Sequence, residues 1–167
     1  MSVTEHRADA PLSVRCAVIT VSDTRTDATD TSGRAIADLL SEHRHGVVYR
    51  AIVPDEHVRI RAALDEMVAR EDVDVVLMTG GTGISRRDGT YEVVHARIEK
   101  RLDGFGELFR MLSYADVGPA AMLSRACAGL ASATIVIAMP GSEAAVRLAM
   151  QKLVLPELGN LVREARR

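Results

Sequence analysis

The sequence predicts an α/β protein with three layers, in which a mostly parallel sheet is covered by helices on both faces. Short apolar runs rich in β-branched residues alternate with segments whose apolar residues recur at helical spacing. Several of these runs are almost continuously apolar, as strands buried on both faces of a parallel sheet are. The chain also shows no internal repeat and no low-complexity linker, so the elements are expected to form one layered unit.

The first half of the chain reads as three strand segments, two of which are followed by a helix. We expect strands at residues 14–21, 47–53 and 73–79, and helices at residues 34–43 and 56–71. Pro54 closes the second strand, because proline cannot donate to a strand ladder. The third strand leads directly into a glycine-rich loop.

The second half is less regular. Residues 91–101 have a weak helical stripe, and residues 104–118 predict a short, bent helical segment. Strands are expected at residues 126–131 and 134–139, close enough for a hairpin or a tight bend. Residues 143–166 have helical spacing interrupted by Pro156 and Gly159, which predicts two helices or one broken helix.

Length and composition indicate a single domain. The chain has 167 residues, of which 47% are hydrophobic and 26% charged, and this lies well within the globular range. Residues 1–11 are polar and are expected to form a flexible arm. Residues 12–167 are expected to form the α/β domain.

Composition also excludes several classes of function. A net charge of -2 and an aromatic content of 3% leave neither the positive field nor the stacking platforms of a nucleic-acid-binding protein. No apolar run is long enough to cross a membrane, so a cytoplasmic protein is expected.

The cysteines and histidines do not predict a metal site. Cys16 and Cys127 lie in apolar runs and are expected to be buried thiols. The five histidines show no zinc-binding spacing.

The strongest local signal follows the third predicted strand. This loop consists of Gly80, Gly81, Thr82 and Gly83. Glycines at the carboxyl end of a strand allow backbone N–H groups to turn toward an anion such as phosphate. Arg86 and Arg87 add guanidinium donors, and Asp88 supplies the hard oxygen ligand that Mg²⁺ prefers. The alternative is a glycine-rich turn without a function.

Polar residues also follow the other predicted strands, and the carboxyl ends of parallel strands meet at one edge of a sheet. Asp55 is expected to approach Asp88 there and to share a cation with it, or else to be an ordinary helix N-cap. Ser22 and Asp23 are expected to add substrate-binding groups. Ser142 either helps to bind an anion or caps the helix that follows it.

Capping is also expected for the helix that follows the first polar loop. Thr31 or Ser32 stands in front of the apolar helical stripe and is the residue type that caps helices.

Six motifs, in order, resemble the molybdenum cofactor biosynthesis MoaB/Mog family, and FGELFR and LSRACAG resemble its MoaB branch. The motifs are ITVSD, VPDE, TGGTGISRRD, FGELFRMLSY, LSRACAG and IAMPGS, and they span nearly the whole chain. The resemblance implies a molybdopterin-binding α/β fold and a homotrimer or homohexamer. It also implies molybdopterin adenylyltransferase activity, in which the terminal phosphate of molybdopterin attacks the α-phosphorus of ATP and pyrophosphate is released.

Residue by residue, the resemblance implies catalytic roles and Mg²⁺ ligation for Asp55 and Asp88. It implies substrate binding by the loop from Gly80 to Gly83 and by Ser142. The chain departs from the family pattern at Gly89, which is expected to loosen the backbone beside Asp88.

Two other functions are compatible with this resemblance. One is a non-catalytic molybdopterin-binding protein of the MoaB branch. The other is a nucleotide pyrophosphatase similar to the competence-damage proteins, which usually have a further domain that this length leaves no room for.

Overall fold

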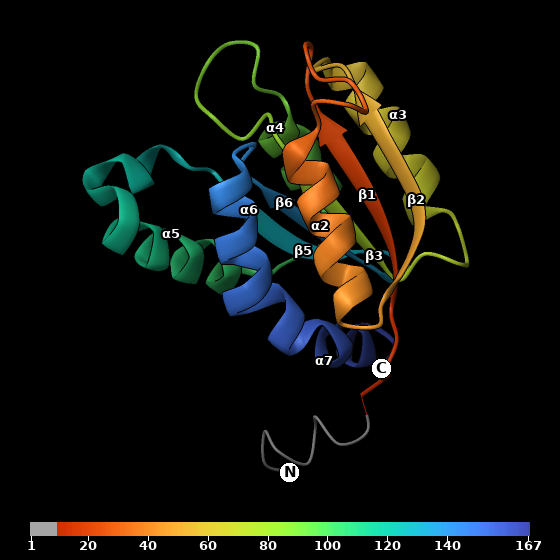
Figure 1. The fold of residues 1–167 in the computed structure, drawn as a ribbon. Helices are drawn as coiled ribbons and strands as arrows, with labels where there is room; N and C mark the ends of the chain where they lie inside the picture. The colour runs from red at the N-terminus through yellow and green to blue at the C-terminus, as the bar shows by residue number, and fades with distance from the viewer. Residues whose placement is uncertain (1–9) are drawn as a thin grey trace.

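A computed structural model describes residues 10–167 of this protein. In this part of the chain six strands form one sheet in the order β2-β1-β3-β6-β5-β4 (Figure 1). Strands β2, β1, β3 and β6 are parallel, whereas β5 runs antiparallel to β6 and β4 antiparallel to β5. The strands are β1 (Arg15–Val21), β2 (Gly46–Val53), β3 (Val75–Thr79), β4 (Lys100–Arg101), β5 (Cys127–Ala131) and β6 (Thr134–Met139). The mostly parallel α/β fold is therefore confirmed.

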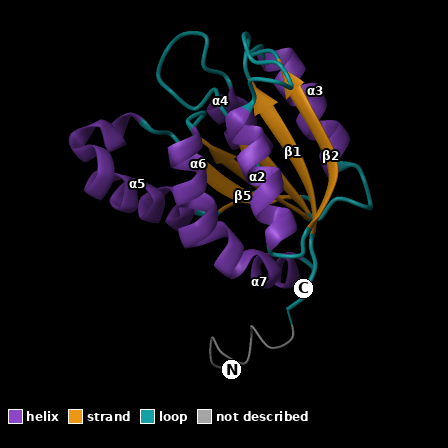
Figure 2. Ribbon diagram, in the orientation of Figure 1, coloured by secondary structure: helices purple, strands orange, loops and turns teal. Residues whose placement is uncertain are grey.

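Helices cover both faces of this sheet (Figures 1 and 2). They are α2 (Thr31–Glu42), α3 (His57–Val68), α4 (Thr90–Arg97), α5 (Asp103–Val117), α6 (Glu143–Ala149) and α7 (Leu155–Ala165). Helices α2, α5, α6 and α7 pack on one face, and α3 and α4 pack on the other. None of the helices within residues 10–167 has the length and apolar character needed to cross a membrane.

The core is divided between the two faces of the sheet. This division explains why the sequence of β1 is continuously apolar. Cys16 and Val18 point into the cluster beneath α2, whereas Ala17 and Ile19 point into the cluster beneath α3. Successive side chains of a strand point to opposite faces, so a strand covered on both sides needs apolar residues at every position.

The expectation of buried thiols is met by Cys16 and only partly by Cys127. Cys16 is buried and Cys127 is half-buried, and neither forms a disulfide. Burial raises the pKa of Cys16 to about 12 and that of Cys127 to about 11. Both side chains are therefore thiols at neutral pH.

The hairpin expected between the last two strands is present. Ser132 and Ala133 connect β5 to β6, and Ala131 pairs with Thr134 across the turn. Ser132 has a φ of 56°, in the left-handed region that tight hairpin turns use.

Helix α2 begins earlier than its apolar stripe suggested. The carboxylate of Asp30 accepts a hydrogen bond from the N–H of Gly33 at 3.0 Å and caps the helix, which then starts at Thr31. The prediction that Thr31 or Ser32 would be the cap was therefore wrong.

Two segments in the second half also differ from expectation. The helix expected at residues 91–101 ends at Arg97, since the last residues form β4 through backbone pairing with β5. The short, bent segment at 104–118 is instead the 15-residue helix α5, followed by a 3₁₀ helix over Gly118–Leu123.

The interruption expected within residues 143–166 is a π-helical turn over Met150–Val154, between α6 and α7. Pro156 lies in the first turn of α7, where a missing N–H costs no hydrogen bond.

The arm expected at residues 1–11 lies mostly outside the described residues. Of this segment only Ala10 and Pro11 are described, and both lie against Gly159 of α7, where an added Cβ would contact Pro11 O at 2.8 Å. The division into an arm and a domain over residues 12–167 stays a prediction.

A buried carboxylate joins the amino ends of β1 and β3 to the carboxyl end of the chain. Asp74 accepts hydrogen bonds from the backbone N–H of Arg15 at 2.9 Å, from its Nη2 at 2.8 Å, and from Nη2 of Arg166 at 2.7 Å. Burial alone would raise the pKa of Asp74, but these donors outweigh it and hold the pKa at about 2.

This geometry predicts a loss of stability in acid. Because the folded-state pKa lies below the ordinary value of 3.8, Asp74 stabilises the fold above that value, and its contribution is lost as the pH falls from about 4 toward 2. Asp74→Asn should lower the free energy of unfolding at pH 7 by about 2 kcal/mol and flatten its pH dependence in that window. Urea denaturation between pH 2 and 7 measures both.

Asp72→Asn is the matched control, because Asp72 forms an ion pair with Arg70 at 2.7 Å on the surface. Its effect should be much smaller than that of Asp74→Asn, because exposed ion pairs contribute little to stability. Equal losses of unfolding free energy in the two variants would show that the buried network stabilises the fold no more than a surface ion pair does.

Candidate functional site

An open hollow of about 610 Å³ lies at the carboxyl ends of β1, β3 and β6. Chain segments that follow three neighbouring strands meet there, as expected for a ligand site in an open α/β sheet. The hollow is lined by Val21, Ser22, Arg25, Gly80, Gly81, Thr82, Gly83, Asp88, Leu123, Ser124, Pro140, Gly141 and Ser142. The predicted glycine loop, Ser22, Asp88 and Ser142 are thus brought together.

The glycine loop is held close to the ends of both neighbouring strands. Gly80 has a φ of 95° and Gly81 a φ of 68°, in the left-handed region that other residues rarely adopt. A Cβ at Gly80 would overlap the carbonyl oxygen of Val21, and the Gly80 N–H donates to Met139 O at 3.0 Å. Glycine at this position therefore lets β1, β3 and β6 meet at the floor of the hollow.

Arg125 anchors the other end of the loop. Its backbone N–H donates to Thr82 O at 3.2 Å and its Nε donates to Gly83 O at 2.9 Å. The same guanidinium forms an ion pair with Glu92 and lies over the ring of Tyr91, 4.8 Å from its centre. Sequence reasoning assigned no role to Arg125, because its partners in the loop are carbonyl oxygens that every residue has.

Asp55 is buried, with 9% of its surface exposed, and lies beside the hollow. Its Oδ1 accepts the N–H of Gly89 at 3.0 Å, and its own N–H donates to Asp23 Oδ1 at 3.0 Å. Helix α3 begins at His57, and its N-cap position is Glu56, without a side-chain hydrogen bond. The interpretation of Asp55 as an N-cap is therefore wrong.

Gly89 ties the segment after Asp88 to Asp55, whereas looseness was expected at this position. The Gly89 N–H is the donor to Asp55, and the next N–H, of Thr90, donates to Gly81 O at 3.0 Å. A Cβ at residue 89 would overlap the ring of His57. The departure from the family pattern thus removes a side chain where two segments come together.

The carboxylates of this region repel one another. Burial raises the pKa of Asp55, and the negative charges of Asp88 and Asp23 raise it further, against the opposing hydrogen bond from Gly89. Asp88 is half-buried, and its Oδ2 accepts the N–H of Ser85 at 2.8 Å. A divalent cation beside Asp55 and Asp88 would relieve this repulsion.

The residues present fit a Mg²⁺ ion that is shared with a substrate. Within residues 10–167 no group of three or more histidine, cysteine, aspartate or glutamate side chains is arranged to hold a metal. Mg²⁺ is commonly held by one or two carboxylates together with water and substrate phosphate oxygens. Asp55 and Asp88 supply the two carboxylates that such a site needs.

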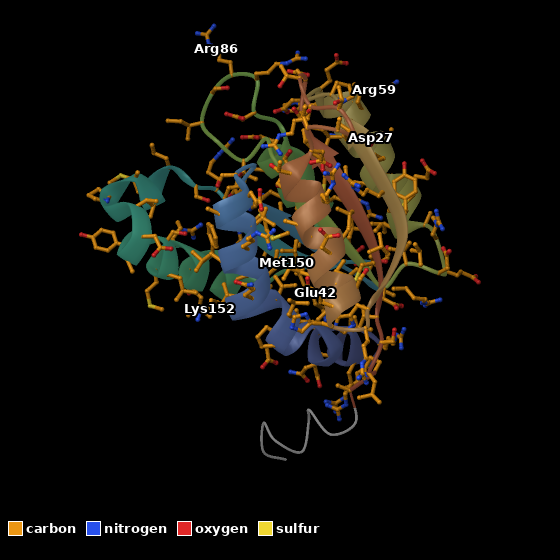
Figure 3. The ribbon with its side chains drawn as sticks, viewed as in Figure 1. Asp27, Glu42, Arg59, Arg86, Met150 and Lys152 are labelled. Atoms are coloured by element: carbon orange, nitrogen blue, oxygen red, sulfur yellow. The ribbon has the colours of Figure 1, made fainter. Side chains whose placement is uncertain are left out.

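Asp23 and the arginines of the loop are arranged differently from the expectation. Asp23 accepts hydrogen bonds from Nε and Nη2 of Arg87 at 2.8 and 3.0 Å, and these hydrogen bonds lower its pKa. Arg87 is therefore occupied by an ion pair outside the hollow. Arg86 is exposed at the tip of the loop and points away from the molecule (Figure 3).

The two predicted serines line the hollow and also organise the backbone. Ser22 Oγ accepts the N–H of Arg25 at 3.1 Å. Ser142 Oγ accepts the N–H of Ala145 at 3.3 Å and caps α6, so the capping interpretation is confirmed. Neither bond uses the hydroxyl proton, which leaves each serine able to donate to a ligand.

Arg25, which also lines the hollow, was missed by the sequence analysis. The polar loop after β1 contains it, but one arginine in a loop is an uninformative signal. With Arg25, the lining combines backbone amides, hydroxyls, a guanidinium and a carboxylate. This set of groups is suited to a phosphate accompanied by a cation.

Comparison with known proteins gives consistent matches over the whole chain. The family model described as a probable molybdopterin binding domain matches residues 17–160. Molybdenum cofactor biosynthesis protein B of Bacillus anthracis is 54% identical over 168 aligned positions, which cover 100% of this chain and 99% of that protein.

Solved structures agree with this result. A crystal structure of a molybdenum cofactor biosynthesis protein B is 52% identical, with a TM-score of 0.91 over 95% of this chain and 99% of that one. The tungsten cofactor synthesizing protein MoaB from Pyrococcus furiosus is 38% identical, with a TM-score of 0.84 over 95% of this chain and 100% of that one.

The contact between Gly80 and Val21 predicts a sharp difference between two glycine substitutions. Gly80→Ala should destabilise the protein by more than about 1 kcal/mol, because a Cβ is unfavourable at this φ and overlaps a backbone oxygen. Gly104→Ala is the control, since a Cβ at Gly104 meets no atom within 4 Å. Thermal unfolding of both variants tests this, and equal melting temperatures would contradict it.

Proposed function

The chain belongs to the molybdenum cofactor biosynthesis protein B (MoaB) family, and on this basis we propose that it is a molybdopterin adenylyltransferase. It transfers AMP from ATP to the terminal phosphate of molybdopterin and releases pyrophosphate. The observation that supports this proposal most directly is the position of Asp55 and Asp88 beside a hollow floored by the glycine loop.

The chemistry matches what this chain provides. The nucleophile is a phosphate oxygen of molybdopterin, which is already ionised at neutral pH and needs no general base. It forms a bond to the α-phosphorus of ATP while the bond from that phosphorus to the bridging oxygen breaks and pyrophosphate leaves. Such a transfer depends on positioning and on charge neutralisation.

The roles of the residues follow from their places. The glycine loop and the hydroxyls of Ser22 and Ser142 bind and orient the pterin phosphate. Asp55 and Asp88 hold Mg²⁺, which when bound neutralises charge on the reacting phosphates. Asp23 fixes the backbone of Asp55 through the hydrogen bond at 3.0 Å and thereby orients the carboxylate.

Direct detection of the product tests the proposal. The purified protein is incubated with molybdopterin, ATP and Mg²⁺, and adenylylated molybdopterin is sought by mass spectrometry. Product should form with Mg²⁺ or Mn²⁺ and disappear with EDTA, whereas a zinc-specific chelator should have no effect. Binding of molybdopterin without any product would support the non-catalytic alternative.

We predict that Asp88→Asn and Asp55→Asn each abolish adenylylation while molybdopterin binding and folding are retained. An amide keeps the size of the side chain but removes the charge that holds the cation. The double variant should be little worse than either single variant, because losing one ligand already disables a shared site. Turnover and melting temperature are measured together on all three, and near-normal turnover of Asp88→Asn would refute the mechanism.

We also propose that the protein is a homo-oligomer, a trimer or a hexamer, that associates through α5 and the 3₁₀ helix after it. These elements form an exposed apolar patch, consisting of Leu108, Met111, Tyr114, Val117, Met122 and Leu123. Several large exposed apolar side chains on neighbouring elements are typical of an interface between proteins.

Charge placed on this patch should dissociate the assembly. The double substitution Leu108→Glu and Met111→Glu is expected to reduce the mass measured by light scattering to that of a monomer. Val58→Glu in α3 is the control, since Val58 is also exposed, at 78%, but lies outside the patch. A wild-type protein that is monomeric at micromolar concentration would contradict the proposal.

A further inference from the structure

Arg25 stands on the wall of the hollow in a fixed position. Its Nη2 donates to Gly141 O at 3.0 Å and its Nη1 donates to Ser32 Oγ at 2.9 Å. Only 28% of the side chain is exposed. The guanidinium is thus held between the loop after β6 and the start of α2, two segments that are far apart in the sequence.

The carboxylate that pairs with Arg25 is shared with a second arginine. Asp30 Oδ1 lies 3.7 Å from Arg25 Nη1, but Oδ2 of the same carboxylate accepts a hydrogen bond from Arg50 Nη2 at 2.9 Å. Burial would raise the pKa of Asp30, but the donors Arg50, Gly33 and Thr20 outweigh it and keep the carboxylate ionised. Two guanidiniums therefore share one negative charge, and Arg25, the more distant of the two, retains an excess of positive charge.

Arg25 also retains unused donors. Its Nε–H and one Nη2–H have no hydrogen-bond partner within residues 10–167. An arginine presents five N–H donors in a planar fork whose edges match two oxygens of a phosphate. A half-buried guanidinium that is held in place and only partly used is suited to binding an anion.

The wall of the hollow has a positive charge at one place and a negative charge at another. Among the described residues that line it, Arg25 is the only cation and Asp88 the only carboxylate. Arg86 and Arg87 do not contribute, because the first points outward and the second is paired with Asp23. A ligand that has a phosphate at one end and a bound cation at the other would match this arrangement.

We propose that Arg25, together with the glycine loop and the two serines, binds the phosphate monoester of the substrate beside Gly141 and Ser142, with the cation at the opposite side near Asp88. The identity of the ligand rests on the proposed function, whereas the recognition of phosphate by Arg25 does not. Asp30 and Ser32 are positioning residues in this scheme. They hold the guanidinium but do not touch the ligand.

Binding of inorganic phosphate, measured by isothermal titration calorimetry without metal or nucleotide, tests the proposal. Arg25→Met, which removes the charge and keeps much of the length, should lower the phosphate affinity by about tenfold or more, as expected for hydrogen bonds to a charged group. Arg25→Lys should recover part of the loss, because it restores the charge but not the planar fork.

Arg86→Ala is the matched control, since it removes the same charge from an exposed side chain at the tip of the loop, outside the lining of the hollow. It should bind phosphate as the wild type does. Melting temperatures show whether each variant is folded. A folded Arg25→Met protein with wild-type phosphate affinity would overturn the proposal, and so would an Arg86→Ala protein with an equal loss.

Turnover separates this inference from the proposed function. If the wild type forms no adenylylated product but Arg25→Met still loses phosphate affinity, the binding site stands and the enzymatic proposal fails. If product forms and Arg25→Met leaves the KM for molybdopterin unchanged, the role of Arg25 fails while the enzyme assignment stands. The proposal predicts a raised KM for molybdopterin.

Discussion

The site depends on how closely the backbone of Gly80 approaches the backbone of Val21. Because no side chain separates them, the ends of β1 and β3 lie side by side, and the loop can turn across them at positive φ. The Gly80 N–H then reaches Met139 at the end of β6. Most of the groups that line the hollow come from the segments that follow these three strands.

Repulsion between carboxylates is the second feature of the site. A fold selected for stability alone would not bury Asp55 near two other aspartates, since each negative charge raises the free energy of its ionised form. The hydrogen bond from Gly89 offsets only part of this cost. Such an unfavourable arrangement is typical of functional sites, where a ligand or a cation supplies the missing positive charge.

The fold and the glycine loop were predictable because their signals are local. Continuous apolar strands, helical stripes and a glycine cluster after a strand can each be recognised within a few residues. The roles of Arg25 and Arg125 were not, because their partners Gly141 and Gly83 are distant in sequence and contribute only carbonyl oxygens. The two-residue strand β4 was missed for a similar reason, since its conformation comes from pairing with β5 rather than from its own sequence.

Asp55 shows a different limit. An aspartate before a helix has the same local sequence whether it caps that helix or contacts a distant segment. Its hydrogen-bond donor, Gly89, is 34 residues away, so only the folded chain distinguishes the two roles. The position of the helix cap at Glu56 could not be inferred from composition either, because Glu56 makes no capping hydrogen bond.

The anchoring of the glycine loop by Arg125 also bears on how fast a ligand can bind. The loop is held at Gly80 by the end of β6 and at Thr82 and Gly83 by Arg125, so its floor is already shaped before a ligand arrives. Association with such a preformed surface needs no slow rearrangement of the backbone. The rate of association is then set by diffusion, orientation and electrostatic steering, and differences in affinity among related ligands arise mainly from their rates of dissociation.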